Sequence, residues 1–491
     1  MPSFYSRQQW LAVFSILAVI SLYFTLFLPY VGEEAVYTIS AYEMWFHHHY
    51  LLNTLYGDFY GRPPLLNWLI IPIAKLIGWS HMLEASRFVS ATATALVALT
   101  TYGFVKRLSK SQHFALLCAA IYLTGDLLFV RGWLAYADPL LSLFIFISIA
   151  CLWLAVEEKH ICFFLFAAIA LSAGFLTKAL SPYWFYGLAG LVLLVFHHNR
   201  KFLLHPASIL IHLFTISVPV LWNYIADPRY LYAMWYEATN TAFSPSLGKY
   251  IYQAIATQPV MLLLRLAPIS LIAVFYYFKK VRKQDDAQFP GIAKIAFWIA
   301  LLNFAVCWFA PRWPEARYYM PVFPLMAMCM AYVIWNAGNK ALKLTGVFLL
   351  VTLLLKLVYV GVMYYQYELK RPDYRAVAQR IVARVGDQPF YADKYTCQSA
   401  PVLKAASYIN LMRYPKPPLE YQPDDRWGVI ELDALGLFPL PHNYPPSLNW
   451  NNAFMLGQLR TQRDTLVAQY AKRKRRVYLF CRGTACLTRK L

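Results

Sequence analysis

Long apolar runs separated by short polar segments dominate the chain. Crossing the hydrocarbon layer of a bilayer takes about 20 consecutive, mostly apolar residues. By that length the sequence predicts about eleven transmembrane helices, at residues 10–30, 84–105, 112–130, 138–156, 160–177, 181–197, 202–223, 257–278, 292–310, 319–336 and 343–364. The first run is too long for a signal-peptide core and lacks a small-residue cleavage site, so we expect it to be retained as the first helix. The pattern is typical of an α-helical polytopic membrane protein.

Basic residues in the short loops predict the orientation of these helices. If the N-terminus is cytoplasmic, alternation puts four basic loops on the same side, at 106–110, 197–201, 279–283 and 340–343. An excess of Lys and Arg marks the cytoplasmic side of a membrane. The opposite side then receives the longer loops, 31–83 and 224–256, and everything after about residue 365.

The last part of the chain has a different pattern. Residues 366–491 hold many prolines and no apolar run of spanning length. Helical periodicity around 373–386 and 453–470, with strand-like runs at 388–392, 427–432 and 476–481, predicts a small α/β unit. We therefore divide the chain into a transmembrane domain, residues 1–365, and a soluble C-terminal domain, residues 366–491, on the non-cytoplasmic side. Whether Cys481 and Cys486 close a disulfide loop there stays open.

Composition and charge narrow the class of partner. The chain of 491 residues is 59% hydrophobic and only 14% charged, yet its formal net charge is +21. Because the apolar runs hold few charges, the basic excess lies in the loops and the C-terminal part, where it suits anionic lipids and anionic substrates. No DNA- or RNA-binding motif stands out, so nucleic acid is set aside. The cysteines show no metal-type CxxC spacing.

Two adjacent carboxylates follow the first apolar run, in the segment Gly32-Glu33-Glu34-Ala35-Val36-Tyr37. A carboxylate held there could take a proton from an acceptor hydroxyl, or hold a divalent cation beside a phosphate. The alternative is that Glu33 and Glu34 only solvate the end of a helix. The run His47–His49 follows, but three consecutive residues do not share one helical face, so these histidines alone are not expected to bind a metal.

An arginine in a stiff loop comes next, in the run Gly61-Arg62-Pro63-Pro64-Leu65-Leu66-Asn67-Trp68. The two prolines end any helix and fix an extended backbone, so Arg62 projects from a rigid segment. A guanidinium in such a position suits bidentate phosphate binding. The alternative is that Arg62 anchors the adjacent segment to lipid head groups.

Further charged residues lie in smaller loops on the same predicted side. Asp138 precedes Pro139 at the start of a span, where it belongs either to a site or to a helix N-cap. Lys178 lies between two spans. The long loop and the segment before the last spans add Glu237, Asn240, Arg312 and Arg317. Together these residues predict a site for a lipid-linked phosphate, with carboxylates for an incoming nucleophile.

Five of these segments, in this order, resemble the polyprenyl-phosphate-sugar-dependent integral-membrane glycosyltransferases, which include protein O-mannosyltransferases and the aminoarabinose transferases that modify lipid A. The family opens with Asp-Glu-x-x-Tyr, where this chain has Glu33–Tyr37, and continues with Lys/Arg-Pro-Pro-Leu-x-x-Trp, matched by Arg62–Trp68. The later matches are Asp138-Pro139-Leu140-Leu141, Phe175-Leu176-Thr177-Lys178-Ala179 and Arg317-Tyr318-Tyr319-Met320-Pro321-Val322-Phe323-Pro324.

This resemblance implies the GT-C fold, implies that Glu33 is the catalytic acid/base, and puts Arg62 on the donor phosphate. Two departures stand out. Glu33 replaces the Asp usual in the family, and its extra methylene moves the carboxylate by about 1 Å. The family's Glu-x-x-x-Arg-Phe loop motif stands here as residues 237–243 without its Arg, which puts the acceptor contacts of this loop, Glu237 and Asn240, in question.

The sequence therefore predicts an inverting transferase that moves one sugar from a polyprenyl phosphate of undecaprenyl type to an acceptor on the periplasmic face of a bacterial inner membrane. Glu33 is expected to deprotonate or orient the acceptor, with support from Glu34 and Asp138, while Tyr37 belongs to the acceptor loop. The expected donor-phosphate ligands are Arg62, Lys178, Arg312 and Arg317. No cofactor is demanded, although a divalent cation at Glu33 and Glu34 is possible.

Several readings of the function stay open at this point. Lipid A or another envelope glycolipid is the first expected acceptor, and a protein hydroxyl is the second. From other classes, the same charged loops would serve a transporter or flippase of lipid-linked sugars, or a non-catalytic assembly scaffold.

Overall fold

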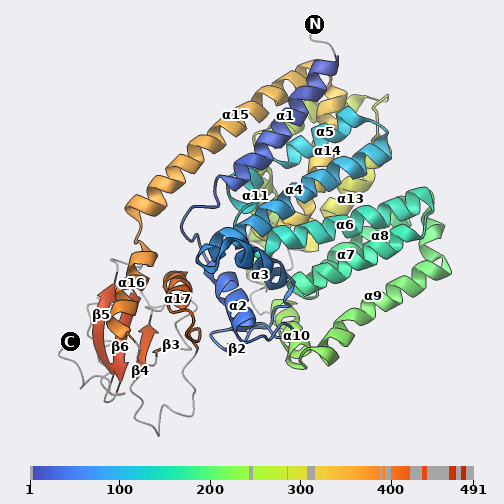
Figure 1. The fold of residues 1–491 in the computed structure, drawn as a ribbon. Coiled ribbons are helices and arrows are strands. Elements are labelled where there is room, and N and C mark those ends of the chain that lie inside the picture. Colours follow the sequence, from blue (N-terminus) through green and yellow to red (C-terminus); the bar gives the residue numbers. More distant parts are fainter. Residues whose placement is uncertain are drawn as a thin grey trace. The chain divides into compact units, whose positions relative to one another are not determined.

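The computed structural model describes residues 4–242, 247–284, 286–306, 316–386, 390–392, 400–420, 434–438, 464–470 and 477–482 (Figure 1). The α-helices are α1 Phe4–Tyr23, α2 Ala35–Phe46, α3 Leu65–Ile77, α4 Met82–Ser109, α5 Gln112–Tyr122, α6 Ala137–Glu158, α7 Cys162–Lys178, α8 Ser181–Phe196, α9 Pro206–Ile225, α10 Arg229–Ala242, α11 Leu247–Arg265, α12 Ile269–Lys279, α13 Pro290–Val306, α14 Phe323–Ala337, α15 Asn339–Tyr364, α16 Tyr374–Val385 and α17 Ala400–Met412. Short 3-10 or π turns are η1 Trp79–His81, η2 Leu127–Arg131, η3 Arg200–Leu204, η4 Val281–Lys283, η6 Ala316–Val322 and η7 Tyr365–Lys370. The strands are β1 Thr54–Leu55, β2 Asp58–Phe59, β3 Phe390–Ala392, β4 Ala434–Phe438, β5 Asp464–Tyr470 and β6 Val477–Arg482.

The chain forms two compact units, each assembled from several segments. Unit 1 contains Met1–Leu26, Gly61–Leu66 and Arg87–Gly361. Unit 2 contains Phe27–Tyr60, Asn67–Ser86 and Val362–Leu491. This grouping differs from a simple division of the chain at residue 365, because most of the first long loop joins the C-terminal part. The division into a transmembrane and a soluble domain stays a prediction.

Five helices within the described residues are long and apolar enough to cross a membrane: Trp79–Ser109, Ala137–Glu158, Pro206–Ile225, Arg317–Ala337 and Asn339–Val385. The bent pair Thr257–Arg265 and Ile269–Lys283 makes a sixth if it counts as one span. The predicted count of eleven is therefore not confirmed. Each predicted span contains an apolar helix, but several, such as α7 with 17 residues and α8 with 16, are shorter than a bilayer requires.

In unit 1, α6 is buried along most of its length. It packs against α7 and α8, and the three helices run side by side (Figure 1). Trp153 and Phe146 of α6 meet the ring of Phe104 edge-on, with ring centroids 5.4 and 6.0 Å apart. By contrast, α9 exposes Leu210 and Phe214. Exposed apolar side chains of this kind suit contact with lipid.

The predicted span at 112–130 is broken in the structure. α5 ends at Tyr122, and Gly125 takes a left-handed backbone, with φ +61°, before the π turn η2. A Cβ on Gly125 would lie 2.3 Å from the carbonyl oxygen of Arg265, so a larger residue requires the backbone to move. The turn leads the chain to Tyr136, after which α6 begins with Asp138 in its first turn.

Polar contacts fix the segment between η2 and α6. Trp133 is fully buried, and its indole Nε1 donates to the carbonyl oxygen of Phe129 at 2.8 Å. The guanidinium of Arg87 lies 5.2 Å from the centre of the Trp133 ring, and the ammonium of Lys356 lies 5.4 Å from it. The hydroxyl of Ser90 donates to the carbonyl of Tyr136. These contacts hold the start of α6 in place.

Unit 2 combines helices with a sheet of mixed direction. The strand order is β3-β4-β6-β5, with β3 parallel to β4 and the other pairs antiparallel. α16 packs against α17, and α17 packs against α2. The carboxylate of Asp373 accepts hydrogen bonds from the backbone N–H groups of Arg375 and Ala376, at 2.9 and 3.1 Å, and so caps α16.

The sequence-based elements of this region agree with the structure in part. The helical run at 373–386 corresponds to α16, and the strand-like runs at 388–392 and 476–481 correspond to β3 and β6. The helical prediction for 453–470 is wrong at 464–470, which form β5 and pair along β6. The partner strand supplies backbone hydrogen bonds that helical periodicity does not anticipate. Residues 427–432 and the pair Cys481–Cys486 lie outside the described residues or side chains.

Candidate functional site

Asp138 is buried at the first turn of α6, with 2% of its surface exposed. Its Oδ1 accepts a hydrogen bond from the ammonium Nζ of Lys178, at the end of α7, over 2.6 Å. The N-cap of α6 is Tyr136, without a side-chain cap, so the N-cap alternative for Asp138 is wrong. The neighbouring ammonium attracts the carboxylate more strongly than a backbone amide would.

Two guanidinium groups join this pair within unit 1. The Nε of Arg317, in η6, lies 3.9 Å from Oδ2 of Asp138. The positive charge of Arg62 acts on both Asp138 and Lys178. We call these four residues the cation cluster. With three cations and one carboxylate, the cluster carries a formal charge of +2.

Two tyrosines form aromatic walls beside the cation cluster. The ammonium of Lys178 lies 4.6 Å from the centre of the Tyr318 ring. The guanidinium of Arg317 lies 5.1 Å from the Tyr136 ring and 5.6 Å from the Tyr318 ring. Cation–π contacts restrict the positions of both cations. Sequence reasoning did not assign either tyrosine a role, although Tyr318 directly follows Arg317 and Tyr136 lies two positions before Asp138.

The cation cluster is complementary to an anion of more than one charge. The side chains of Lys178 and Arg317 are mostly buried, with exposed fractions of 14% and 16%. Water and salt screen such charges less than they screen exposed ones. Guanidinium and ammonium groups with several converging donors are typical ligands of phosphate. The arrangement can therefore hold a phosphate group and stabilise negative charge that develops on it.

The two predicted acids of the first loop have different surroundings in unit 2. Glu33 is exposed, whereas Glu34 is fully buried. The Oε2 of Glu34 accepts a hydrogen bond from the backbone N–H of Val31 at 2.7 Å, which closes the loop before α2. Glu34 therefore stabilises its own loop, and Glu33 is the carboxylate that a ligand can reach.

The sequence is similar to a family of glycosyltransferases and to individual members of known name. Residues 28–239 match the family model described as dolichyl-phosphate-mannose-protein mannosyltransferase. An undecaprenyl phosphate-alpha-4-amino-4-deoxy-L-arabinose arabinosyl transferase of Yersinia enterocolitica is 29% identical over 150 residues, 30% of this chain and 27% of that protein. A protein named as the second such transferase of Sodalis glossinidius is 24% identical over 350 residues, 68% of this chain and 61% of that protein. The matches thus span less than two thirds of either relative's length.

Solved structures extend the likeness to the whole fold. ArnT from Cupriavidus metallidurans bound to undecaprenyl phosphate has a TM-score of 0.67 at 14% identity, over 96% of this chain and 98% of that chain. The archaeal oligosaccharyltransferase AglB from Archaeoglobus fulgidus has a TM-score of 0.53 at 11% identity, over 83% and 64%. The chain therefore shares the fold of ArnT, and its residues 28–239 resemble the dolichyl-phosphate-mannose-protein mannosyltransferase family.

The region that matches the family model contains Glu33, Arg62, Asp138 and Lys178, and it ends before Arg317. Arg312 lies outside the described residues. Glu237 and Asn240 belong to α10, but their side chains lie outside those described. Their predicted contacts with donor and acceptor therefore stay predictions.

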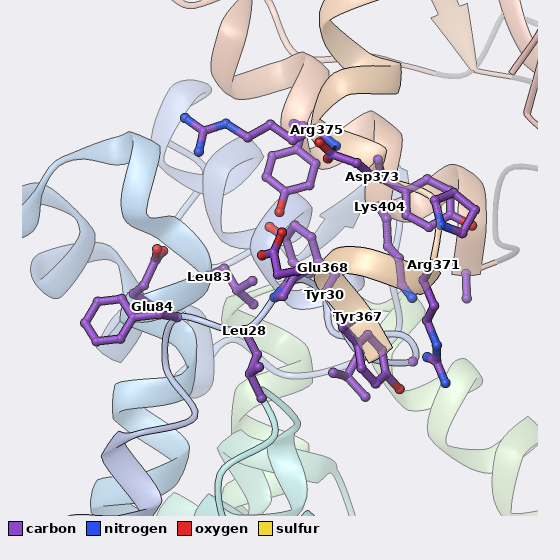
Figure 2. Close-up of a pocket in the computed structure, with 18 of the residues that line it drawn as sticks. Leu28, Tyr30, Leu83, Glu84, Tyr367, Glu368, Arg371, Asp373, Arg375 and Lys404 are labelled. Carbon is purple, nitrogen blue, oxygen red and sulfur yellow. Dashed lines mark hydrogen bonds between the residues drawn. The ribbon is translucent and has the colours of Figure 1, made fainter. Parts of the chain in front are cut away.

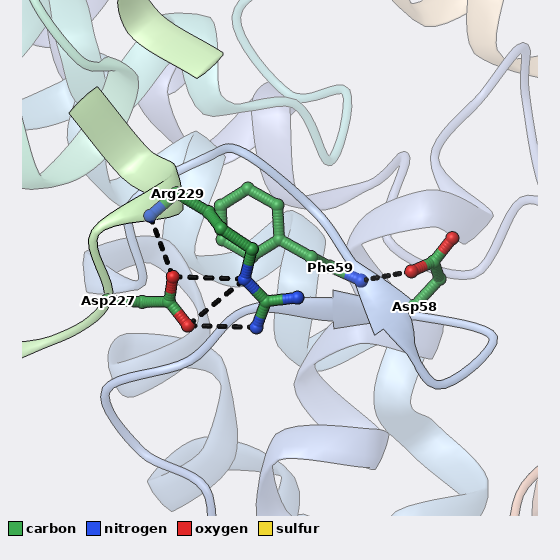
Figure 3. Close-up of polar contacts among 4 residues, drawn as sticks. All are labelled: Asp58, Phe59, Asp227 and Arg229. Atoms are coloured by element: carbon green, nitrogen blue, oxygen red, sulfur yellow. Dashed lines mark hydrogen bonds and ion pairs between the residues drawn. The ribbon is translucent and has the colours of Figure 1, made fainter. Parts of the chain in front are cut away.

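At the start of α10 the structure does describe one ion pair. The guanidinium of Arg229 donates to both carboxylate oxygens of Asp227, with its Nη2 2.8 Å from Oδ2 (Figure 3). The Arg229 backbone N–H also donates to Asp227 Oδ1. This local network orients the first turn of the helix.

Glu43 is a buried acid that sequence reasoning missed. Its carboxylate accepts hydrogen bonds from the hydroxyl of Thr54 at 2.8 Å and from the backbone N–H groups of Tyr56 and Gly57 at 2.7 and 3.1 Å. These donors belong to the β1–β2 hairpin, in which Asp58 begins β2 (Figure 3). Burial raises the pKa of Glu43 to about 7, against the opposing effect of these hydrogen bonds. The loop between α2 and α3 is thus tied to α2 by one carboxyl group.

The predicted metal position at Glu33 and Glu34 gains no third ligand from the described residues. The one group of three potential metal ligands found there is Glu157, His197 and His198. The Nδ1 of His197 accepts a hydrogen bond from the backbone N–H of Asn199, and its Nε2 lies 2.8 Å from Glu157. With Nδ1 as acceptor, Nε2 carries the proton and donates to Glu157.

Proposed function

We propose that this chain transfers one sugar, with inversion, from a polyprenyl phosphate of undecaprenyl type to an acceptor at the periplasmic face of a bacterial inner membrane. The observation that carries the proposal is the cation cluster, in which Arg62, Lys178 and Arg317 surround one carboxylate. Its formal charge of +2 and its aromatic walls suit the phosphate of a lipid carrier. The fold shared with ArnT supports the same substrate class.

In the proposed step, the oxygen of an acceptor hydroxyl attacks the anomeric carbon of the sugar from the face opposite the phosphate. The new C–O bond forms while the bond between the anomeric carbon and the phosphate oxygen breaks. The electron pair of the broken bond stays on the leaving polyprenyl phosphate. Attack from the opposite face inverts the anomeric configuration. Negative charge therefore grows on the phosphate, where the cation cluster stabilises it.

The hydroxyl proton goes to the carboxylate of Glu33 in this proposal. A general base has to be reachable by the acceptor, and the exposure of Glu33 supports that role. Glu34 acts through the loop, since its buried carboxylate holds the backbone at Val31. Asp138 serves the donor substrate indirectly, because it positions Lys178 and Arg317 for the donor phosphate.

Lipid A, or another envelope glycolipid, is the proposed acceptor. The two relatives named as arabinosyl transferases support it, and their names suggest aminoarabinose on undecaprenyl phosphate as the donor. A protein hydroxyl is the second candidate, favoured by the match of residues 28–239 to a protein mannosyltransferase family. Both acceptors present a hydroxyl to the same chemistry.

The experiment that tests the proposal uses Glu33→Gln and Arg62→Ala in membranes that contain a radiolabelled lipid-linked sugar. We expect each variant to reduce transfer at least about 100-fold, because each removes a group that acts mainly in the transition state. Asp58→Asn and Arg282→Ala change an exposed acid and an exposed base of similar size and serve as matched controls. Full transfer by both site variants, correctly inserted, would sink the mechanism.

The same membranes distinguish a transferase from the alternative function, a flippase. A flippase moves the lipid-linked sugar across the bilayer without forming a new glycosidic bond. Mass spectrometry of envelope lipids with and without the chain detects that bond directly. Movement of the donor in the absence of any glycosylated product would replace the transferase proposal.

A further inference from the structure

A cavity of about 710 Å³ lies within unit 2 and shares no lining residue with the cation cluster. Its lining comes from the segments 27–32, 80–84, 367–375 and 400–411 (Figure 2). Ligand pockets in proteins have volumes of about 300–1,000 Å³. The cavity is therefore large enough for a saccharide.

Tyrosines form much of the cavity wall. Tyr30, Tyr367, Tyr374 and Tyr408 come from three separate segments. The rings of Tyr30 and Tyr408 meet edge to face, with centroids 5.1 Å apart, and the hydroxyl of Tyr30 lies 2.7 Å from that of Ser407. A tyrosine offers an apolar ring face and a polar tip. A pyranose ring offers apolar C–H faces and hydroxyl edges, so the two surfaces match.

Cations line the cavity as well. Lys404 is buried, with 8% of its surface exposed, and its ammonium lies 5.6 Å from the centre of the Tyr374 ring. The guanidinium of Arg371 lies 3.6 Å from the centre of the Tyr367 ring, which fixes its plane. Figure 2 shows Lys404 and Arg371 along one side of the cavity. A buried cation attracts an anion strongly because water screens it little.

Carboxylates line the cavity too, and two of them have structural partners. Asp373 caps α16, and Glu84 lies 3.4 Å from His81. Glu368 is exposed. Figure 2 shows Glu84 on the side opposite Lys404 and Arg371, Glu368 near the centre, and the guanidinium of Arg375, a third cation of the lining, extending toward the Glu84 side. Carboxylates accept hydrogen bonds from sugar hydroxyls, whereas cations bind phosphate. The lining therefore offers both kinds of group that a phosphorylated sugar needs, with Lys404 and Arg371 together on one side for the phosphate.

Residues that line the cavity directly precede the proposed base in the sequence. Tyr30, Val31 and Gly32 line it, and Glu33 follows directly. Adjacent Cα atoms are about 3.8 Å apart. A ligand in the cavity therefore lies beside the segment that carries the Glu33 carboxylate, as an acceptor must.

We propose that this cavity receives the phosphorylated saccharide head group of the acceptor glycolipid. Lys404 and Arg371 bind a phosphate, and the tyrosine faces contact the sugar rings. The inference rests on the proposed function, because it names where the acceptor of that transfer binds. It assigns the acceptor to unit 2 and leaves the donor phosphate to the cation cluster of unit 1.

The test measures binding and turnover separately on the purified full-length chain. Lys404→Gln and Arg371→Gln remove two of the three cations that line the cavity, and Arg375 is kept in both variants. Lys370→Gln and Arg380→Gln are the matched controls, because both residues are exposed and neither lines the cavity. The probes are lipid A with its phosphates, dephosphorylated lipid A and phosphatidylglycerol, with undecaprenyl phosphate as a donor-side check. Native mass spectrometry reports binding, and steady-state transfer reports KM and kcat.

We expect Lys404→Gln and Arg371→Gln to weaken lipid A binding at least about tenfold and to raise the acceptor KM similarly. Their kcat and undecaprenyl phosphate binding stay at the wild-type level, which also shows that they fold. Arg371→Lys keeps the charge but loses the planar fork, so it recovers part of the binding. Wild-type protein binds dephosphorylated lipid A as weakly as the two Gln variants bind lipid A.

Two results would overturn the proposal. One is equal lipid A binding by the wild type and both Gln variants. The other is displacement of lipid A by phosphatidylglycerol at equal concentration, which would make the cavity a general anionic-lipid site. Phosphate-dependent lipid A binding without any sugar transfer would instead support the cavity and remove the proposed function. Sugar transfer with an unchanged acceptor KM in both Gln variants would support the proposed function and remove the cavity as the acceptor site.

Discussion

Asp138 carries one negative charge among three cations, so its role differs from that of a carboxylate acting alone. It lies 2.6 Å from the ammonium of Lys178 and 3.9 Å from the guanidinium of Arg317. Breaking a buried ion pair from one side is strongly destabilising, because an uncompensated charge is left behind. The carboxylate therefore keeps the cations together, and in the proposed function it shares them with the donor phosphate.

This role predicts the behaviour of Asp138→Asn. We expect it to lower the free energy of unfolding by about 3 kcal/mol, and we expect undecaprenyl phosphate to stabilise the variant more than the wild type. The anion replaces part of the missing charge. Thermal unfolding in detergent, with and without the lipid, measures both effects. Asp227→Asn, which breaks a pair with the largely exposed Arg229, should change stability by less than about 1 kcal/mol. Equal stabilisation of wild type and Asp138→Asn by the lipid would contradict the phosphate role.

The buried carboxyl of Glu43 predicts a pH dependence of unit 2. Its pKa is raised from an ordinary value of 4.5 to about 7, so the folded state holds a proton that the unfolded state releases. The stabilising contribution is complete below pH 4.5 and is lost as the pH rises to about 7. The total is of the order of 3 kcal/mol. Above pH 7 the carboxylate is ionised in both states.

Hydrogen exchange of the β1–β2 hairpin between pH 4.5 and 8, corrected for intrinsic exchange, measures this effect. Glu43→Gln does not titrate, so its protection should vary less across this range than that of the wild type. The amide cannot accept from all three donors, and we expect an overall loss of about 1–3 kcal/mol at low pH. Parallel pH profiles for wild type and variant would show that another group causes the dependence.

At the scale of the elements, the break between α5 and α6 decides where Asp138 lies. Gly125 has a positive φ, and the carbonyl of Arg265 lies 2.3 Å from the position of a Cβ. Asp126, the next residue, accepts a hydrogen bond from the guanidinium of Arg265 at 2.9 Å. The turn therefore joins η2 to the end of α11 by a close backbone approach and an ion pair.

Gly125→Ala should destabilise the chain by at least about 2 kcal/mol, because a Cβ adds left-handed strain to a direct clash. Gly103→Ala is the control, since nothing lies within 4 Å of its Cβ position in α4. There Ala should be neutral or stabilising by about 0.5–1 kcal/mol. Apparent unfolding temperatures of both variants test this, and a harmless Gly125→Ala would mean that the turn relaxes without loss.

At the scale of the whole molecule, the loop charges predict which face of the membrane each loop occupies. Asp58, which begins β2, and Lys110, between α4 and α5, are both exposed. Single cysteines at these positions, in a chain with the native cysteines replaced by serine, should react from opposite sides. We expect an impermeant thiol reagent to label Asp58→Cys from the periplasmic side and Lys110→Cys from the cytoplasmic side. Labelling of both from one side would refute the predicted orientation.

The sequence was most informative where the signal is local. Apolar runs predicted the positions of the helices, because only sustained apolarity matches a hydrocarbon layer. The short motifs predicted Arg62, Lys178 and Arg317 as donor-phosphate ligands and Asp138 as a catalytic acid, and the structure brings these four residues together in unit 1. The sequence alone could not show that Asp138 pairs with Lys178, 40 residues away, rather than capping its own helix.

Only the tertiary structure decided which distant segments share a unit and a cavity. Tyr30 and Tyr408 lie 378 positions apart in the sequence, yet their rings are 5.1 Å apart in the wall of the unit 2 cavity. The sequence shows Glu43 only as a polar residue, whereas its burial under the β1–β2 hairpin raises its pKa. Hydrophobic periodicity indicates on which face of its own helix or strand each residue lies. Which helices and loops then pack together depends on long-range side-chain contacts, and those contacts built the cavity, the tyrosine walls and the environment of each charge.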